Sequence, residues 1–235
     1  KVKIAKKELS EREQNVILTK KAFIKYLEKD FEEADRLLKE AFNIYDSPNL
    51  IDDISESHWL AGLIALELGQ LEKAKVELKW FDTIHERYKI SENNYYHPLK
   101  FYTHLQCRIY EKAGQLDKAV AGYKKLIQLK TQLSYWITYY NYQFFHTEYI
   151  AFLIRNEKMV QALAEIDRCL EFNTGYAPAL WKKIKVMESL GQSETMPIYR
   201  QIDSFYNSGR SIESKFRENN QYRITLKEKL KSAVE

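Results

Sequence analysis

The sequence predicts an all-α protein, and three observations support this prediction. Apolar residues recur at steps of three and four along nearly all of the 235 residues, which is the period of an amphipathic helix. The chain contains only 7 Gly and 4 Pro, too few for the many tight turns of a β-sandwich or β-barrel. No stretch alternates strictly between apolar and polar residues, as a half-buried strand would. We therefore expect about ten to eleven helices joined by short loops.

The composition narrows the class of protein further. Apolar residues make up 45% and charged residues 30% of the chain, which is typical of a globular protein with a buried core. Cys107 and Cys169 are the only cysteines, so a disulfide scaffold and a four-cysteine zinc site are excluded within this sequence. No apolar run reaches the roughly 18 to 20 residues that a membrane-spanning helix needs.

The helical pattern is divided by short turns that resemble one another. Residues 68–74, Leu-Gly-Gln-Leu-Glu-Lys-Ala, are nearly repeated in residues 113–119, Ala-Gly-Gln-Leu-Asp-Lys-Ala, and a third copy begins at Leu190. Weaker copies occupy residues 29–34 and 157–162. We therefore place turns near residues 29, 69, 114, 157 and 191. Each predicts a reversal between two antiparallel helices, and such hairpins must stack to bury their apolar faces.

A small or apolar residue follows each turn residue by five positions. These residues are Ala34, Ala74, Ala119, Ala162 and Met196. A small side chain at this place lets the two helix backbones approach closely. Arg200 and Asp203 break the apolar pattern after the last turn, as expected of a terminal repeat whose outer face meets solvent.

The chain is expected to form one array followed by a separate tail. Residues 1–207 carry the five hairpins, and residues 208–235 restart the pattern as a single polar helix. The apolar residues of this helix are Ile212, Phe216, Leu226 and Leu230. This helix could cap the array, extend as a linker, or self-associate as a coiled coil, and its heptad signal is too short to decide.

These hairpins resemble the tetratricopeptide repeat (TPR) family. The residues that carry the resemblance are the Gly-Gln-Leu-x-x-Ala turns at 69 and 114, Tyr110 before the second of them, and Trp59 and Trp181. The resemblance implies a right-handed α-solenoid of about five hairpins plus the C-terminal helix, with a protein or peptide as its partner. Three of the four turn-to-turn spacings exceed the family's typical 34 residues, so these repeats carry longer helices or loops.

The resemblance also implies a binding groove on the first helix of each hairpin. Positions ten and six residues before the turns are those that line the peptide groove in TPR domains. In this sequence the expected groove residues are Trp59, Leu63, His104, Arg108, Thr147, Trp181 and Lys185. Arg108 and Lys185 are candidates for contacts to an anionic group. A solvated inner face with no ligand remains the alternative.

Aromatic residues are unusually abundant, with 17 Tyr, 11 Phe and 4 Trp. They are densest in residues 135–145, where an aromatic run covers every side of a helix. The members most suited to an exposed recognition surface are Tyr135, Trp136, Tyr139, Tyr140 and Tyr142. Tyr and Trp provide large contact area at low cost in side-chain entropy. Packing between repeats is the competing interpretation.

No motif for catalysis, for a cofactor or for a metal stands out. The five histidines include no His-Glu-x-x-His pair, and there is no Cys-x-x-Cys, phosphate-binding loop or Gly-x-Ser-x-Gly sequence. We therefore expect no catalytic, cofactor-binding or metal-ligating residue in this segment. The net charge of +4 comes from 37 basic and 33 acidic residues, without the dense basic face that nucleic acid requires.

The end of the array resembles a second kind of protein more loosely. Residues 197–205 followed by the charged helix are similar to the end of the TPR sensor regions in Bacteroidetes-type two-component signalling proteins. That similarity implies a following membrane span and a histidine kinase, with this segment as the periplasmic signal-input region. Lys227, Lys229 and Lys231 argue against it, because basic flanks favour the cytoplasmic side of a membrane. The alternative is a cytoplasmic scaffold or peptide-responsive regulator.

Overall fold

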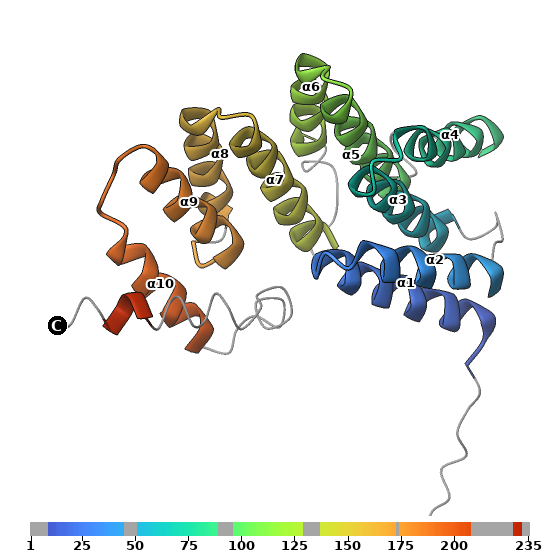
Figure 1. The fold of residues 1–235 in the computed structure, drawn as a ribbon, viewed down its shortest axis with the longest axis horizontal. Helices are drawn as coiled ribbons and strands as arrows, with labels where there is room; N and C mark the ends of the chain where they lie inside the picture. The colour runs from blue at the N-terminus through green and yellow to red at the C-terminus, as the bar shows by residue number, and fades with distance from the viewer. Residues whose placement is uncertain are drawn as a thin grey trace, which may run out of the picture. The chain divides into compact units, whose positions relative to one another are not determined.

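The computed structural model describes residues 9–44, 51–88, 96–128, 137–172, 174–207 and 228–231. Within these ranges the chain forms ten α-helices and a short helical stretch at 228–231, and no described residue lies in a β-strand (Figure 1). The all-α prediction is confirmed. The helices are α1 Glu11–Leu27, α2 Phe31–Ile44, α3 Ile51–Glu67, α4 Leu71–Tyr88, α5 Tyr96–Lys112, α6 Leu116–Gln128, α7 Ile137–Arg155, α8 Met159–Phe172, α9 Ala177–Ser189 and α10 Met196–Asn207.

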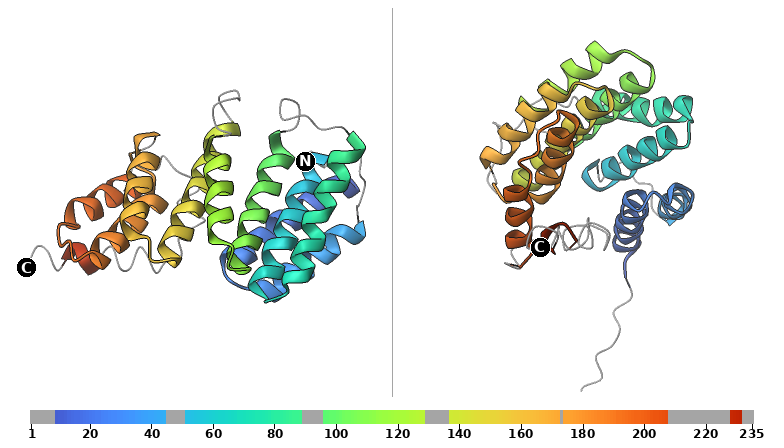
Figure 2. Two further views of the ribbon diagram at one scale, coloured as in Figure 1. Left: turned by 90° about the horizontal axis from the view of Figure 1, so that it is seen from above. Right: turned by 60° about the vertical axis from the view of Figure 1, so that its left-hand side comes forward.

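The chain divides into two compact units, Lys1–Leu129 and Lys130–Glu235. In the first unit the hairpins α1–α2, α3–α4 and α5–α6 stack in chain order, with α3 packed on both α1 and α5. In the second unit α7 pairs with α8, and α9 packs on α7, α8 and α10 (Figure 2). The division falls inside residues 1–207, which the sequence analysis treated as one array.

All five hairpin turns have the same backbone geometry. The turn residue is left-handed in each, with φ of 64° at Lys29, 75° at Gly69, 72° at Gly114, 58° at Glu157 and 72° at Gly191. The N–H of the next residue donates to the carbonyl five residues earlier, at 2.7 to 3.0 Å. This is the Schellman arrangement, which ends a helix and satisfies its last carbonyls. The five turns are therefore structural equivalents, although only three of them contain glycine.

The small residue after the turn lies where the two helices of a hairpin approach each other, as expected from the sequence. Ala34, Ala74, Ala119 and Ala162 are all 0% exposed, each one turn into the second helix of its hairpin. Close approach also occurs between hairpins, where a Cβ added to Gly62 of α3 would lie 2.6 Å from a Leu105 methyl carbon of α5. Small residues thus determine how near neighbouring helices lie.

The fifth hairpin departs from this register. α10 begins five residues after Gly191, whereas α2, α4, α6 and α8 each begin two residues after their turn residue. Met196 is consequently the first residue of α10 and not an inward small-residue position. Tyr199 and Ile202 take the inward positions, at 4% and 0% exposed. This longer turn explains why Arg200, which is exposed, appeared to break the apolar pattern.

The last hairpin carries its own hydrophobic cluster, which we call the terminal cluster. It consists of Ala177, Leu180, Ile184, Ile198, Tyr199 and Ile202. Leu230, from the helical stretch 228–231, packs against it. The other apolar residues of the predicted tail helix lie outside the described residues; they are Ile212, Phe216 and Leu226. None of the helices in the described ranges has both the length and the apolar character needed to cross a membrane.

Candidate functional site

Five of the seven expected groove residues are enclosed by protein. Trp59 is 2% exposed, Leu63 1%, His104 0%, Arg108 5% and Thr147 4%. Trp59 and Leu63 belong to α3, His104 and Arg108 to α5, and Thr147 to α7. The close approach of α3 and α5 at Gly62 leaves no open surface at the first four positions, because the two helices cover one another. The predicted groove is therefore filled by helix packing in the first unit.

Trp59 is the centre of an aromatic row that crosses the first unit. Its indole Nε1 donates a hydrogen bond to Nδ1 of His104 at 2.9 Å. Its ring centroid lies 5.9 Å from that of Phe23 in α1 and 4.9 Å from that of Phe101 in α5. The row continues from His104 to Tyr123 of α6, at 6.0 Å. These rings hold the three hairpins together, so packing between repeats accounts for them.

A second aromatic row includes a histidine–glutamate pair. The His58 ring stacks on Trp80 at 4.0 Å between centroids and lies 4.9 Å from Phe42. A hydrogen bond of 2.7 Å joins His58 Nδ1 to Glu77 Oε2 of α4. A corresponding pair joins α7 and α8 of the second unit, where His146 Nε2 lies 3.0 Å from Glu165 Oε2. The two histidine–glutamate pairs occupy the same positions relative to their hairpin turns. Each pair joins the two helices of its own hairpin.

Arg108 is neutralised inside the first unit. Its guanidinium lies 2.6 Å from a carboxylate oxygen of Glu67 in α3 and 3.4 Å from one of Glu111 in α5. The Arg108 side chain is 6% exposed, against 24% for Glu67 and 11% for Glu111. An external anion would have to displace carboxylates that already surround this cation. The expected anion contact at Arg108 is thus occupied by the protein's own glutamates.

Trp181 and Lys185 are the part of the predicted groove that reaches solvent. They lie four residues apart on α9 and therefore share a helix face. Trp181 is partly buried beside the terminal cluster, and its ring meets that of Tyr199 edge-on at 5.7 Å. Lys185 is exposed, and its ammonium forms no ion pair within the described part of the chain. A large aromatic ring next to an uncompensated cation can contact a ligand with both apolar and anionic groups.

The aromatic surface expected near residue 140 stays a prediction. Tyr135 and Trp136 lie outside the described residues, and Tyr139, Tyr140 and Tyr142 lie in α7 with side chains that the structure does not describe. A different set of partly exposed aromatic residues is described on α5.

Tyr102, Gln106 and Tyr110 form a stripe on α5, of which only Tyr110 was named from the sequence, as a TPR motif residue. They are four residues apart and only partly buried. Gln106 Nε2 donates to Tyr102 Oη at 3.0 Å, and Lys118 Nζ lies 5.6 Å from the centre of the Tyr110 ring. Burial and the nearby Asp82 carboxylate raise the pKa of Tyr102. The four-residue spacing is the signal that could have revealed this stripe from the sequence.

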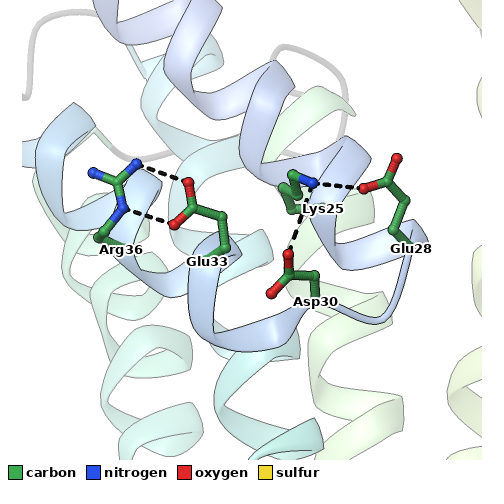
Figure 3. A network of polar contacts seen from close by, with 5 residues as sticks. All are labelled: Lys25, Glu28, Asp30, Glu33 and Arg36. Atoms are coloured by element: carbon green, nitrogen blue, oxygen red, sulfur yellow. Dashed lines mark hydrogen bonds and ion pairs between the residues drawn. The ribbon is translucent and has the colours of Figure 1, made fainter.

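The first hairpin turn is surrounded by a network of surface ion pairs (Figure 3). Lys25 Nζ lies 2.8 Å from Glu28 Oε2 and 3.7 Å from Asp30 Oδ2, and Arg36 Nε lies 2.7 Å from Glu33 Oε2. The hydrogen bond to Glu28 raises the pKa of Lys25, and the hydrogen bond from Arg36 lowers that of Glu33. The charges neutralise one another in solvent, where such pairs contribute little to stability.

Both cysteine thiols are enclosed by protein. Cys107 and Cys169 are free thiols at 0% exposed. Burial raises the pKa of Cys107 to about 12, so its thiol stays protonated at neutral pH and is neither a nucleophile nor a ready metal ligand. Among the described residues, no three His, Cys, Asp or Glu side chains come together as a metal site.

Stacked antiparallel hairpins with left-handed turns and buried alanines define a TPR-like helical repeat fold. A solved structure of this class supports the assignment: the chain is similar to a putative kinesin light chain with nearly identical TPR-like repeats from Podosopora anserina. The TM-score is 0.53 at 15% sequence identity, and the match covers 87% of this chain and 100% of that one. No family model and no curated protein matches the sequence. At this identity the likeness establishes the fold, which in general serves protein–protein interaction.

Proposed function

We propose that this chain is a protein-interaction domain without catalysis of its own, and that it binds a protein or peptide segment on α9. The observation that carries the proposal is the Trp181–Lys185 face. Tryptophan is enriched among the residues that contribute most to binding energy at interfaces. Lys185 is exposed and forms no ion pair among the described residues, so a ligand carboxylate would not have to displace an internal partner.

The expected ligand combines an apolar side chain with an acidic one. The apolar side chain would pack on the Trp181 ring, and the carboxylate would approach the Lys185 ammonium. The two protein groups project from adjacent turns of one helix, so a short segment is long enough to reach both. Arg108 takes no part in this proposal because Glu67 and Glu111 already surround it.

For the whole protein, we propose the signal-input region of a two-component sensor histidine kinase, located in the periplasm and anchored to the membrane. The similarity of residues 197–205 and the charged tail to such sensors supports this role. The second candidate is a cytoplasmic scaffold or peptide-responsive regulator, which the lysines near the C-terminus favour. Reading the gene beyond the codon for Glu235 distinguishes them. A run of about 20 apolar residues close by supports the sensor, and a directly joined soluble domain supports the scaffold.

The binding face is tested by capturing partners from cells of the source organism on the immobilised full chain. Lys185→Glu and Trp181→Ala are compared with Lys79→Glu, an exposed lysine of the first unit that also lacks an ion pair among the described residues. The expected result is a loss of about tenfold or more in captured partner for the two α9 variants, with Lys79→Glu unchanged. If every partner is retained by both α9 variants, the proposed face is wrong.

A further inference from the structure

The terminal cluster meets the only described part of the chain beyond Asn207. Leu230 packs against it from residues 228–231, and Trp181, Met187 and Met196 border the same cluster as partly buried side chains. Trp181 thus belongs to the face proposed for ligand binding and packs on the same cluster as Leu230. Figures 1 and 2 show the short helical stretch beside α10.

The residue types around the cluster suit a helix as occupant. Methionine side chains are unbranched and polarisable, and they adapt to apolar partners of differing shape. Tryptophan adds a large rigid contact. Leu230 lies in a helical stretch between the exposed Lys229 and Lys231, so the segment presents one apolar residue to the cluster and charge to solvent. This is the pattern of an amphipathic helix laid against an apolar surface.

The described contact between residues 228–231 and the terminal cluster is small. Four helical residues form little more than one turn, and helices this short are unstable on their own. The contact forms within one chain, and attachment in the same chain raises the effective concentration of the two surfaces. A contact too weak to form between separate molecules can therefore be populated within one chain, yet remain easy to displace.

We propose that the surface bordered by Trp181, Met187 and Met196 is a docking site for an amphipathic helix, and that the Leu230 segment occupies it as an autoinhibitory plug. A partner segment that places an apolar side chain on Trp181 competes with the plug for the same surface. The contact of Leu230 with the terminal cluster of its own chain does not depend on the proposed function. The regulatory role rests on the proposed function, because the partner must bind the face that includes Trp181.

The test uses a fluorescent peptide of residues 221–235 and the full chain, with binding measured by anisotropy. The variant Leu230→Glu releases the plug, because a carboxylate is disfavoured against the apolar cluster. A plug in place about nine-tenths of the time lowers apparent affinity about tenfold, so this variant should bind the peptide about tenfold more tightly than wild type. Adding Trp181→Ala to Leu230→Glu should abolish that gain. The matched control is Val160→Glu, at an exposed position of α8, which should behave as wild type.

Folding is checked by circular dichroism, and Met187→Glu replaces Trp181→Ala if the latter unfolds. Hydrogen exchange in α9 and α10 should become faster in Leu230→Glu and slow again when the peptide is added. Equal peptide affinity in wild type and Leu230→Glu would overturn the proposal. So would a wild-type dimer that Leu230→Glu dissolves, because the segment would then dock on a second copy.

Failure of the plug proposal can be distinguished from failure of the proposed function. A peptide that binds Leu230→Glu tightly, in a protein that captures no cellular partner, leaves the docking surface in place and removes the partner-binding role. Cellular partners that depend on Lys185, in a protein whose Leu230→Glu variant gains no peptide affinity, leave the binding role and remove the plug.

Discussion

Trp59 and His104 are joined by a hydrogen bond of 2.9 Å between Nε1 of the indole and Nδ1 of the imidazole, across 45 residues of sequence. Both side chains are almost wholly buried. They belong to consecutive hairpins, so this bond specifies how α5 sits on α3. Two residues that the sequence analysis assigned to a groove thereby become part of the structure that holds the repeats in register.

The first prediction concerns this bond. Trp59→Phe keeps an aromatic ring in the row but removes the donor, so it should lower the free energy of unfolding by about 1–3 kcal/mol. Trp59→Ala removes the ring as well and should cost about 3–5 kcal/mol. Urea unfolding of the full chain measures both. Equal stability of Trp59→Phe and wild type would show that the hydrogen bond contributes nothing net.

The second prediction separates a structural role for Arg108 from a ligand-binding one. Arg108→Gln leaves the Glu67 and Glu111 carboxylates without their buried cation, which should cost about 3–5 kcal/mol of unfolding free energy. The control is Lys20→Gln, which breaks the 2.6 Å pair with Glu56 between α1 and α3, where Lys20 is 56% exposed. That change should cost less than about 1 kcal/mol. Weakened partner binding with no loss of stability in Arg108→Gln would restore the groove assignment.

The third prediction uses the two hairpin turns without glycine. Lys29 and Glu157 adopt φ of 64° and 58°, a left-handed conformation that costs a non-glycine residue about 1 kcal/mol. Lys29→Gly and Glu157→Gly should therefore each raise the melting temperature, with a gain of up to about 1 kcal/mol. Gly114→Ala should lower stability by a similar amount through φ alone, because no atom lies within 4 Å of an added Cβ there. Destabilisation by both glycine substitutions would contradict this account of the turns.

The fourth prediction is a pH dependence that arises from Cys107. Burial raises its pKa from 9.0 to about 12, so between these values the unfolded chain loses a proton that the folded chain keeps. Stability contributed by the neutral thiol should fall as pH rises above 9, by about 1.4 kcal/mol per pH unit. Tyr102, Tyr149 and Tyr199 also have pKa values raised by burial, so the comparison must isolate the thiol.

Cys107→Ala provides that comparison. Urea unfolding of both proteins at pH 8 and pH 10 should show a steeper loss for wild type than for the variant, by about 1 kcal/mol. Thiol reagents at pH 8 should leave native Cys107 unmodified and react after unfolding. Rapid modification in the native state would show that the thiol is accessible.

The hairpins were predictable because their signals are local. One helix reversal is marked by a left-handed turn residue followed by a small residue five positions later. Gly69 with Ala74, and Gly114 with Ala119, show this pattern within a short stretch of sequence. The last hairpin was misaligned at Met196, because the spacing of the earlier turns was carried over to it, although Thr195 and Pro197 mark a later helix start. Residues 129–136 contain neither Gly nor Pro, so composition does not mark the division after Leu129.

The sequence by itself determined that this protein is a series of helical hairpins with inward-facing alanines. Helix period, turn chemistry and residue size act over a few residues, so they can be read along one chain. The tertiary structure decided which faces of those helices remain open. The Trp59–His104 hydrogen bond, the Arg108–Glu67 ion pair and the packing of Leu230 on the terminal cluster all join residues that are far apart in the sequence. Exposure is a property of the packed neighbours, and periodicity in one helix does not specify which neighbour covers it.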